Sequence, residues 1–297
     1  TTARVYKRHL VMLETTLVSS NGAGVRGSGD AYDIKLAGGD GRWATFTYRP
    51  NPADVWNLYY GGTGLADVMF RDTVNGGLWC LTNSLQGGSG CRRGSSRYSW
   101  VDDANGLPTV ACISNADDLI PEKTTGNDDP IYIIPNTMGG SHYIRRAVGP
   151  NGPQNGNVVT VGIRNHRVAF ETNASNMGWG FRGHHVYVAN MGGNGIAELV
   201  SKNPATGQPL TMATGSVVTY NPCSGVGIGG PNGEIVVCTC ISPEITSQTG
   251  HEVDVVIWDR AAGTMLIASA NSPWGVNDDA HVSPSGRYVA WEAYPSP

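Results

Sequence analysis

Residues 286–291 read Gly286-Arg287-Tyr288-Val289-Ala290-Trp291, a turn glycine followed by a short apolar run. The same pattern recurs, with glycine or asparagine in the turn, at 41–46, 165–170 and 233–238. A looser copy with one extra residue occupies 106–112. Five copies of one short strand indicate a repeat protein, and an internal repeat governs the fold before single elements are considered.

A second pattern follows the first four copies. It is a polar residue, an apolar strand and usually a turn, at 67–72, 129–132, 185–190 and 254–259. A further strand-like run comes after each, at 78–82, 141–147, 196–201 and 265–270. The copy at 286–291 has no such continuation, but residues 4–9 and 14–19 match the missing half. We therefore expect the last repeat to combine strands from both ends of the chain.

These repeats predict an all-β fold, a five-bladed β-propeller closed by N- and C-terminal strands that share one blade. The repeat positions Phe46, Cys112, Phe170, Cys238 and Trp291 are spaced evenly enough for similar blades. We expect one propeller domain over residues 1–297, with blades at about 20–84, 85–148, 149–201, 202–270, and 271–297 plus 1–19. A β-sandwich with chance similarity between its strands is the alternative.

Composition excludes several classes of protein. The chain has 297 residues, 15% of them charged, and a net charge of −4, which disfavours a nucleic-acid binder. No apolar run approaches the roughly 18 residues that span a bilayer, so we expect no membrane span. The 41 glycines and 17 prolines suit many short strands joined by turns.

The repeats resemble the TolB-like, PD40-type family of propellers. Three stretches carry the resemblance: 283–291, 67–72 and 115–121. The resemblance implies an extracytoplasmic protein, secreted, on a cell surface or in a virion. Members of the family serve as binding scaffolds, translocation partners, peptidase accessory domains or polysaccharide lyases. The fold alone therefore does not determine the activity.

Six cysteines permit disulfides in an extracytoplasmic protein. Cys80 ends a strand-like run and Cys91 lies in the loop after it, so we expect them to pair. We also expect Cys223 to pair with either Cys238 or Cys240, which share one face of a strand. Cys112 and Cys238 occupy aromatic repeat positions, where a small buried hydrophobic residue is the alternative interpretation.

One group of residues could support a lyase, because that reaction needs a base and a cation beside a uronate carboxylate. The candidate catalytic residues are Arg182, His184, His185, Tyr187 and His281. The alternative is that His184 and His185 are polar residues at a strand edge. In particular, His185 stands where other repeats carry aspartate, so it could simply cap a turn.

Acidic residues give weaker signals. Asp33, Asp102, Asp103, Asp278 and Asp279 lie on or near first strands, but nothing around them matches the acid pairs of five-bladed furanosidases. We expect no cofactor, with calcium the one candidate, because residues 102–106, 117–118 and 127–129 could supply hard oxygen ligands. Acidic turn residues are the alternative explanation of these stretches.

Aromatic residues in loops predict a binding surface, because exposed rings suit sugar stacking or a protein interface. The candidate binding residues are Trp56, Tyr59, Tyr60, Trp179, Phe181 and Trp274. Packing against the next blade is the alternative.

The sequence therefore predicts a non-enzymatic extracytoplasmic propeller, acting as a binding or assembly module of a cell surface, filament or virus particle. A protein partner or self-assembly is expected rather than a small molecule. The alternatives are a polysaccharide lyase with an axial active site and a glycan-binding lectin.

Overall fold

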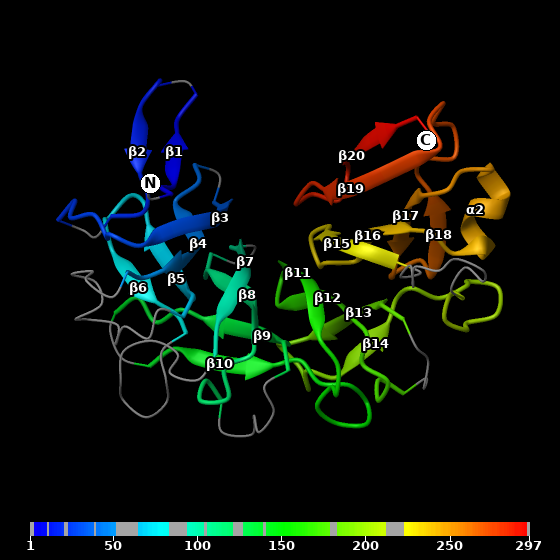
Figure 1. Ribbon diagram of the computed structural model, residues 1–297, viewed down its shortest axis with the longest axis horizontal. Helices are drawn as coiled ribbons and strands as arrows, with labels where there is room; N and C mark the ends of the chain where they lie inside the picture. The colour runs from blue at the N-terminus through cyan, green and yellow to red at the C-terminus, as the bar shows by residue number, and fades with distance from the viewer. Residues whose placement is uncertain are drawn as a thin grey trace. The chain divides into compact units, whose positions relative to one another are not determined.

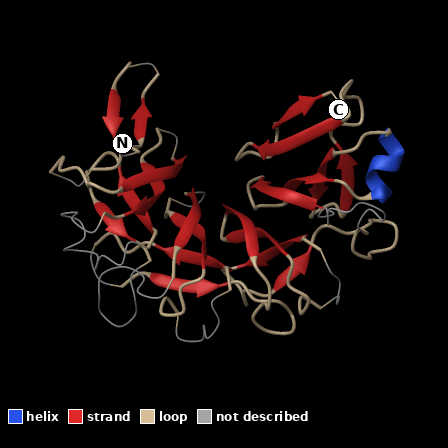
Figure 2. Cartoon of the chain, in the orientation of Figure 1, coloured by secondary structure: helices blue, strands red, loops and turns tan. Residues whose placement is uncertain are grey.

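The structure is a computed structural model. It describes residues 3–10, 12–20, 23–38, 40–51, 65–82, 94–103, 106–120, 127–138, 141–178, 183–211 and 223–295. The chain forms two compact units, Thr1–Arg146 and Ala147–Pro297, which are described separately. Strands make up almost all of the regular structure, as Figure 2 shows.

The first unit holds two four-stranded antiparallel sheets and one hairpin (Figure 1). One sheet has the order β3 (Asp30–Ala37), β4 (Trp43–Arg49), β5 (Asp67–Asp72), β6 (Leu78–Cys80). The other has the order β7 (Ser96–Asp102), β8 (Thr109–Ser114), β9 (Asp129–Ile134), β10 (Tyr143–Arg146). The hairpin pairs β1 (Tyr6–Arg8) with β2 (Thr15–Leu17).

The second unit repeats this plan. One sheet has the order β11 (Val158–Arg164), β12 (Arg167–Thr172), β13 (His185–Asn190), β14 (Ala197–Leu199). The next has the order β15 (Cys223–Gly229), β16 (Ile235–Cys240), β17 (Asp254–Asp259), β18 (Thr264–Ile267). A two-stranded sheet pairs β19 (Val276–Val282) with β20 (Val289–Tyr294), and helix α2 spans Pro243–Thr249.

The all-β prediction is confirmed. Each four-stranded sheet is a simple meander in which every strand pairs with its neighbour in sequence. The structure has β1–β2 and β19–β20 as two separate two-stranded sheets, so their union in one blade stays a prediction. The same holds for the number of blades and for a single domain over residues 1–297. None of the described helices is long and apolar enough to cross a membrane.

The first strand of each four-stranded sheet, and β19 of the β19–β20 pair, contains a break in register with the second strand. The breaks lie at Tyr32/Lys35, Arg97/Trp100, Val158/Thr160, Ser224/Val226 and Asp278/His281. Four of the five place a residue in the left-handed region, at Asp33, Tyr98, Gly225 and Asp279. A bulge bends and twists its strand and re-aims the neighbouring side chains. A shared bulge is thus a structural signature of the repeat.

The second sequence pattern has a physical explanation. The aspartate that opens it accepts a hydrogen bond from a hydroxyl at the end of the fourth strand. Thr82 Oγ1 donates to Asp67 (2.8 Å) and Ser269 Oγ donates to Asp254 (2.6 Å). The same hydroxyls accept the next backbone N–H of the third strand. In these two sheets, the pattern therefore locks the third strand to the segment that directly follows the fourth.

The apolar cores lie between neighbouring sheets of one unit. In the first unit, Trp43 stacks on Phe70 at 5.3 Å, and both belong to a cluster with Val110 and Ile131 of the next sheet. In the second unit, Val186 and Val200 pack in one cluster with residues of the sheet β15–β18. Both faces of these sheets are buried, which explains why the strands do not alternate apolar and polar residues.

Candidate functional site

The interface between sheets β11–β14 and β15–β18 of the second unit holds two polar features. One is a buried carboxylate paired with a histidine. The other is a pocket at the outer strands. Both are built from residues of two repeats that are far apart in sequence but adjacent in the unit.

The buried carboxylate is Glu171, on β12. Its side chain is 1% exposed, and its Oε1 lies 2.7 Å from Nδ1 of His184, just before β13. Its Oε2 accepts hydrogen bonds from Thr160 Oγ1 on β11 (3.1 Å) and from the backbone N–H of Gly225 on β15 (3.1 Å). The carboxylate is therefore well satisfied, and the bulge at Gly225 supplies one of its donors.

This arrangement orients the imidazole. With Nδ1 facing Glu171, Nε2 is the ring nitrogen left to meet a ligand. The His184 side chain is 18% exposed, so the ring is reachable from solvent. A carboxylate that orients a histidine is a common way to position a general base.

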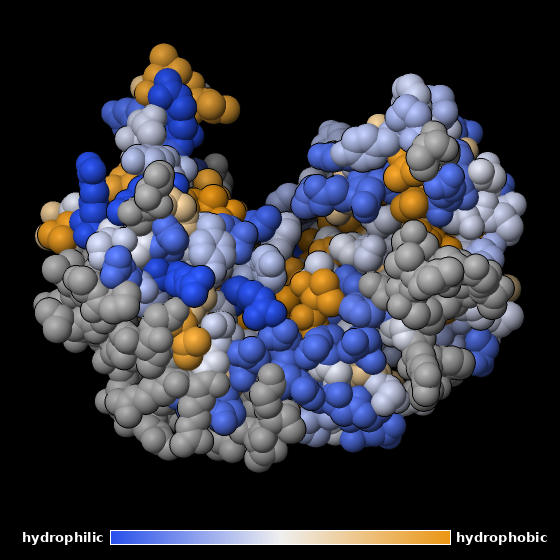
Figure 3. Space-filling model, in the orientation of Figure 1, coloured by the Kyte–Doolittle hydropathy of each residue, from blue (hydrophilic) through white to orange (hydrophobic). Residues whose placement is uncertain are grey.

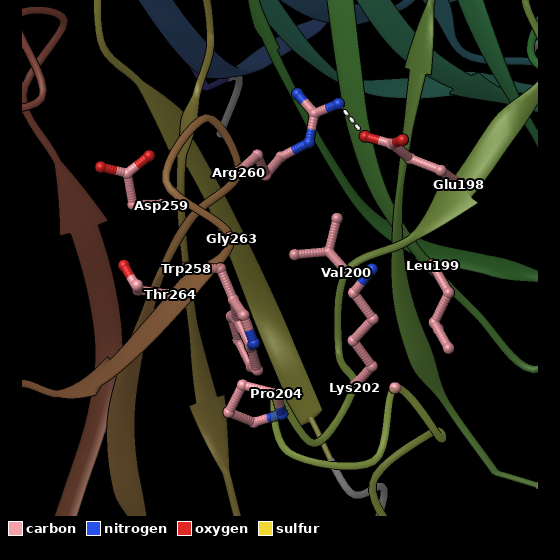
Figure 4. Close-up of a pocket in the computed structure, with 11 residues that line it drawn as sticks. Glu198, Leu199, Val200, Lys202, Pro204, Trp258, Asp259, Arg260, Gly263 and Thr264 are labelled. Atoms are coloured by element: carbon pink, nitrogen blue, oxygen red, sulfur yellow. Dashed lines mark hydrogen bonds and ion pairs between the residues drawn. The ribbon is translucent and has the colours of Figure 1, made fainter.

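The pocket lies where β14 approaches the β17–β18 hairpin. It has a volume of about 250 Å³. Its walls are Glu198, Leu199, Val200, Lys202, Pro204, Gly207, Trp258, Asp259, Arg260, Gly263 and Thr264. Figure 4 shows the indole of Trp258 beside Pro204, with Val200 and Lys202 across from it.

Two donors of the pocket lack a hydrogen-bond partner. Trp258 Nε1 and Arg260 Nε are both shielded from solvent and bond to none of the described residues. Arg260 forms an ion pair with Glu198 and donates to Gly233 O (3.1 Å). Burial, with a contribution from Arg167, lowers the pKa of Arg260 to about 10. Buried donors are normally paired, so these two are unusual, and a ligand in the pocket would reach them only if neighbouring side chains moved. A donor of the pocket wall that solvent reaches directly is the ammonium of Lys202, an exposed residue.

Comparison with known proteins supports the fold. The sequence matches no protein-family model, and no curated protein is similar to it in sequence. The β-propeller domain of the Trilobed protease from Pyrococcus furiosus has a TM-score of 0.55 at 9% identity, covering 99% of this chain and 71% of that one. The chain has a β-propeller fold.

Two further solved propellers are similar at lower scores. TolB from Acinetobacter baumannii is 13% identical, with a TM-score of 0.46 over 94% of this chain and 51% of that one. The acylaminoacyl peptidase from Pyrococcus horikoshii is 10% identical, with a TM-score of 0.47 over 97% of this chain and 40% of that one. The propeller thus spans about half the length of the TolB structure.

The predicted catalytic residues occupy different environments in the propeller. Among the candidates that the structure describes, His184 faces a buried carboxylate from a partly exposed position. Tyr187 is buried in β13 and stacks on Phe170 at 5.9 Å, and burial raises its pKa to about 12. His281 on β19 is exposed and lies 3.5 Å from Asp279. Arg182 lies outside the described residues.

His185 has the role that aspartate has in other blades. Its Nδ1 lies 3.3 Å from Ser201 Oγ, which also accepts the N–H of Val186. This matches the pairs Asp67–Thr82 and Asp254–Ser269. Burial, with a contribution from His184, lowers the pKa of His185 to about 4. The geometry is that of a neutral residue locking two strands.

One of the two predicted disulfides falls within the described residues. Cys223 bonds to Cys240, its direct neighbour across β15 and β16, with their Cα atoms 4.3 Å apart. Cys238 is a buried free thiol close to both, and burial together with Glu171 raises its pKa well above the usual range. Cys80 is buried, and Cys91 lies outside the described residues, so this pair stays a prediction.

The other predicted binding positions are mostly not described. Of the six aromatic candidates, Trp274 alone falls within the described residues, and it is 44% exposed. Trp56, Tyr59, Tyr60, Trp179 and Phe181 lie outside them.

The calcium candidates have other contacts where the structure describes them. Asp128 forms an ion pair with Arg97 at 2.7 Å, and Asp129 lies 3.7 Å from Arg146. Among the acidic residues near first strands, which are a separate set, Asp278 accepts a hydrogen bond from Thr239 at 2.9 Å. Residues 104 and 105 of the stretch 102–106 lie outside the described residues.

Sequence reasoning missed Glu171 and the pocket. A signal existed for Glu171, because an acidic residue stands in a strand whose repeat partners carry Thr47, Ile113 and Thr239. A charge in a buried strand needs partners, and that need could have singled it out. No comparable signal marks Trp258, Lys202 or Arg260, because the pocket forms only where two blades meet.

Proposed function

We propose that the chain is a five-bladed propeller in which β19 and β20 share a blade with β1 and β2. The bulge common to β3, β7, β11, β15 and β19 supports five equivalent first strands. Each of these strands except β19 begins a four-stranded meander. Two strands from each end of the chain would complete the fifth blade.

We further propose that this propeller is a non-enzymatic binding or assembly module in an extracytoplasmic setting, such as a cell surface, a filament or a virus particle. The disulfide Cys223–Cys240 supports an oxidising compartment. The pocket between the third and fourth blades carries the functional part of the proposal. Its walls offer apolar surface, the cations Lys202 and Arg260, and the carboxylates of Glu198 and Asp259.

The expected ligand of this pocket is a protein segment with an apolar side chain beside an acidic or carbonyl acceptor. A donor-lined apolar cleft fits such a segment. The test is selection of a random-peptide display library against the protein, with counter-selection against the Lys202→Glu variant. Enriched acidic peptides whose Kd rises about tenfold in that variant would support the proposal. Peptides that bind both proteins equally would contradict it.

Assembly is tested by light scattering and negative-stain imaging of the native material. A homomer with a contact well above ~1,000 Å² supports an assembly role. A strict monomer would remove assembly from the proposal and leave partner binding.

A polysaccharide lyase is the second candidate, because Glu171 orients His184 in a partly exposed position. A lyase forms a double bond that absorbs in the ultraviolet, so acidic polysaccharides can be screened directly. Product formation lost in His184→Ala but kept in His281→Ala would favour this candidate. Absence of product from all substrates would leave the Glu171–His184 pair as a structural contact within the sheet β11–β14, which Glu171 also joins to Gly225 of the next sheet.

A further inference from the structure

The β1–β2 hairpin ends in exposed apolar side chains. Leu10 is 80% exposed, Met12 62% and Leu13 65%. Figure 3 shows hydrophobic atoms covering the end of this hairpin above a hydrophilic region. Single exposed apolar residues are ordinary, but three at one tip form a patch that usually marks an interaction site.

The loop is closed rather than loose. The N–H of His9 donates to Glu14 O (2.8 Å), and the N–H of Met12 donates to Nδ1 of His9 (3.1 Å). At the base, Lys7 Nζ donates to Gly41 O (3.0 Å) and Thr73 Oγ1 (3.2 Å) of the same unit. The hairpin therefore holds its apolar tip away from the sheet.

The backbone at the tip is strained in a way that favours function over stability. Leu13 has φ 59°, in the left-handed region that leucine rarely adopts. Glycine or asparagine would relieve this strain, and a polar residue would remove apolar surface from solvent. Leucine neither relieves the backbone strain nor reduces the exposed apolar surface. Such a residue is typical of a site that contacts another molecule.

Cationic residues lie behind the tip. Arg4 donates to Gly29 O and Lys7 to Gly41 O at the base of the hairpin, so Arg8 is the cation next to the tip. Glu14 is the one carboxylate in residues 4–17. Arg8 is exposed and donates to Thr15 Oγ1 (2.7 Å) across the hairpin. An apolar tip beside an exposed arginine matches the two layers of a membrane surface, which is apolar below and anionic at the headgroups.

We propose that this hairpin inserts its tip into the headgroup region of a membrane that contains anionic lipids. The size of the patch favours a lipid surface over a protein partner. A stable protein interface buries about 800 Å² on each partner, which three side chains at a hairpin tip cannot supply. Membrane anchoring needs only a few apolar side chains and nearby cations, and both are present here.

The test is co-sedimentation of the full chain with vesicles of phosphatidylcholine and phosphatidylglycerol, compared with phosphatidylcholine alone. We expect binding to the anionic vesicles, weaker at high salt. Leu10→Ser and Leu13→Asn should each weaken binding about tenfold or more. Asparagine tolerates the left-handed backbone at position 13, so that variant should fold as well as the wild type.

Two controls keep the result interpretable. Leu107 is also 65% exposed in the same unit, and Leu107→Ser should bind vesicles like the wild type. Arg8→Gln should lose the preference for anionic vesicles. Binding to neither vesicle would overturn the proposal, as would equal binding by the tip variants and wild type. A tip-dependent dimer in light scattering without vesicle binding would assign the tip to a second copy of the chain instead.

Discussion

At the scale of the residue, one structural position carries different chemistry in different blades. Asp67 and Asp254 accept a hydroxyl donor, while His185 performs the same strand-locking task with a neutral imidazole. The two aspartates accept hydrogen bonds from these hydroxyls. A buried histidine stays neutral, and its charged form is disfavoured. Histidine in place of aspartate at this position makes the stability of the sheet β11–β14 depend on pH.

Acidification should therefore destabilise the protein in a defined window. The folded pKa of His185 is about 4, below the ordinary value of 6.5, so the unfolded chain binds the proton first. Stability is complete above about pH 6.5 and falls as the pH drops towards 4, by up to about 3 kcal/mol. Burial lowers the pKa of His142 as well, which adds a contribution of the same sign.

Urea unfolding at several pH values measures this effect. Asparagine at position 185 keeps a hydrogen-bonding group opposite Ser201 but does not titrate. In His185→Asn, most of the change in unfolding free energy between pH 4 and 6.5 should therefore vanish. A variant with an unchanged slope would show that His185 is already protonated or exposed in the folded state.

A second residue-scale prediction concerns the disulfide Cys223–Cys240. It closes a loop with a sequence separation of 17, so reduction should lower the free energy of unfolding by about 3 kcal/mol. Denaturation with and without a reductant measures the difference. The matched control is the double variant Cys223→Ser/Cys240→Ser, in which any remaining response to reductant comes from other cysteines. Equal responses of variant and wild type would refute the pairing.

At the scale of the element, glycine stands just before a first strand where the chain passes close to the loop that follows the second strand. A Cβ on Gly94 would lie 2.6 Å from the backbone of Ala116, and one on Gly156 would lie 2.6 Å from the backbone of Ala174. Both glycines stand two residues before a first strand, in equivalent places of two blades. The close approach lets Asn115 Oδ1 accept a hydrogen bond from the N–H of Ser95, the residue after Gly94. In the same way, Asn173 Oδ1 accepts a hydrogen bond from the N–H of Asn157, the residue after Gly156.

Gly156→Ala should therefore destabilise the protein by about 1–3 kcal/mol, because the obstacle is backbone and cannot rotate away. Gly192→Ala is the matched control, since a Cβ there meets nothing closer than 3.5 Å. Its unfolding free energy should stay within about 0.5 kcal/mol of the wild type. Thermal unfolding measures both variants. If both lost similar unfolding free energy, the effect of the Gly156 substitution would not come from a clash of the new Cβ with the backbone of Ala174.

At the scale of the whole molecule, closure of the ring would change the environment of β20. As the second strand of a shared blade, β20 would have hydrogen-bonded neighbours on both sides, as β16 has with β15 and β17. As one strand of an isolated pair, it would leave every other N–H unpaired. An open edge would also favour pairing with other chains.

Hydrogen exchange of the full chain distinguishes the two cases. If the blade is shared, the amides of Val289–Tyr294 should be protected as well as those of β16. The outer strand β18 provides the reference for a strand with one free edge. Alternating fast and slow amides in β20, as in β18, would contradict closure by the N-terminal strands.

Patterns along the chain predict the strands, their grouping into repeats and the turns between them. Those features depend on hydrogen bonds between residues close in the chain, such as Asp67 with Thr82, and such bonds leave a periodic pattern. The partner of Cys223, the surroundings of Glu171 and the position of the pocket at Trp258 follow from the folded arrangement of the strands instead. These features join residues of different strands or blades, whose contact depends on bulges and packing that no local pattern records.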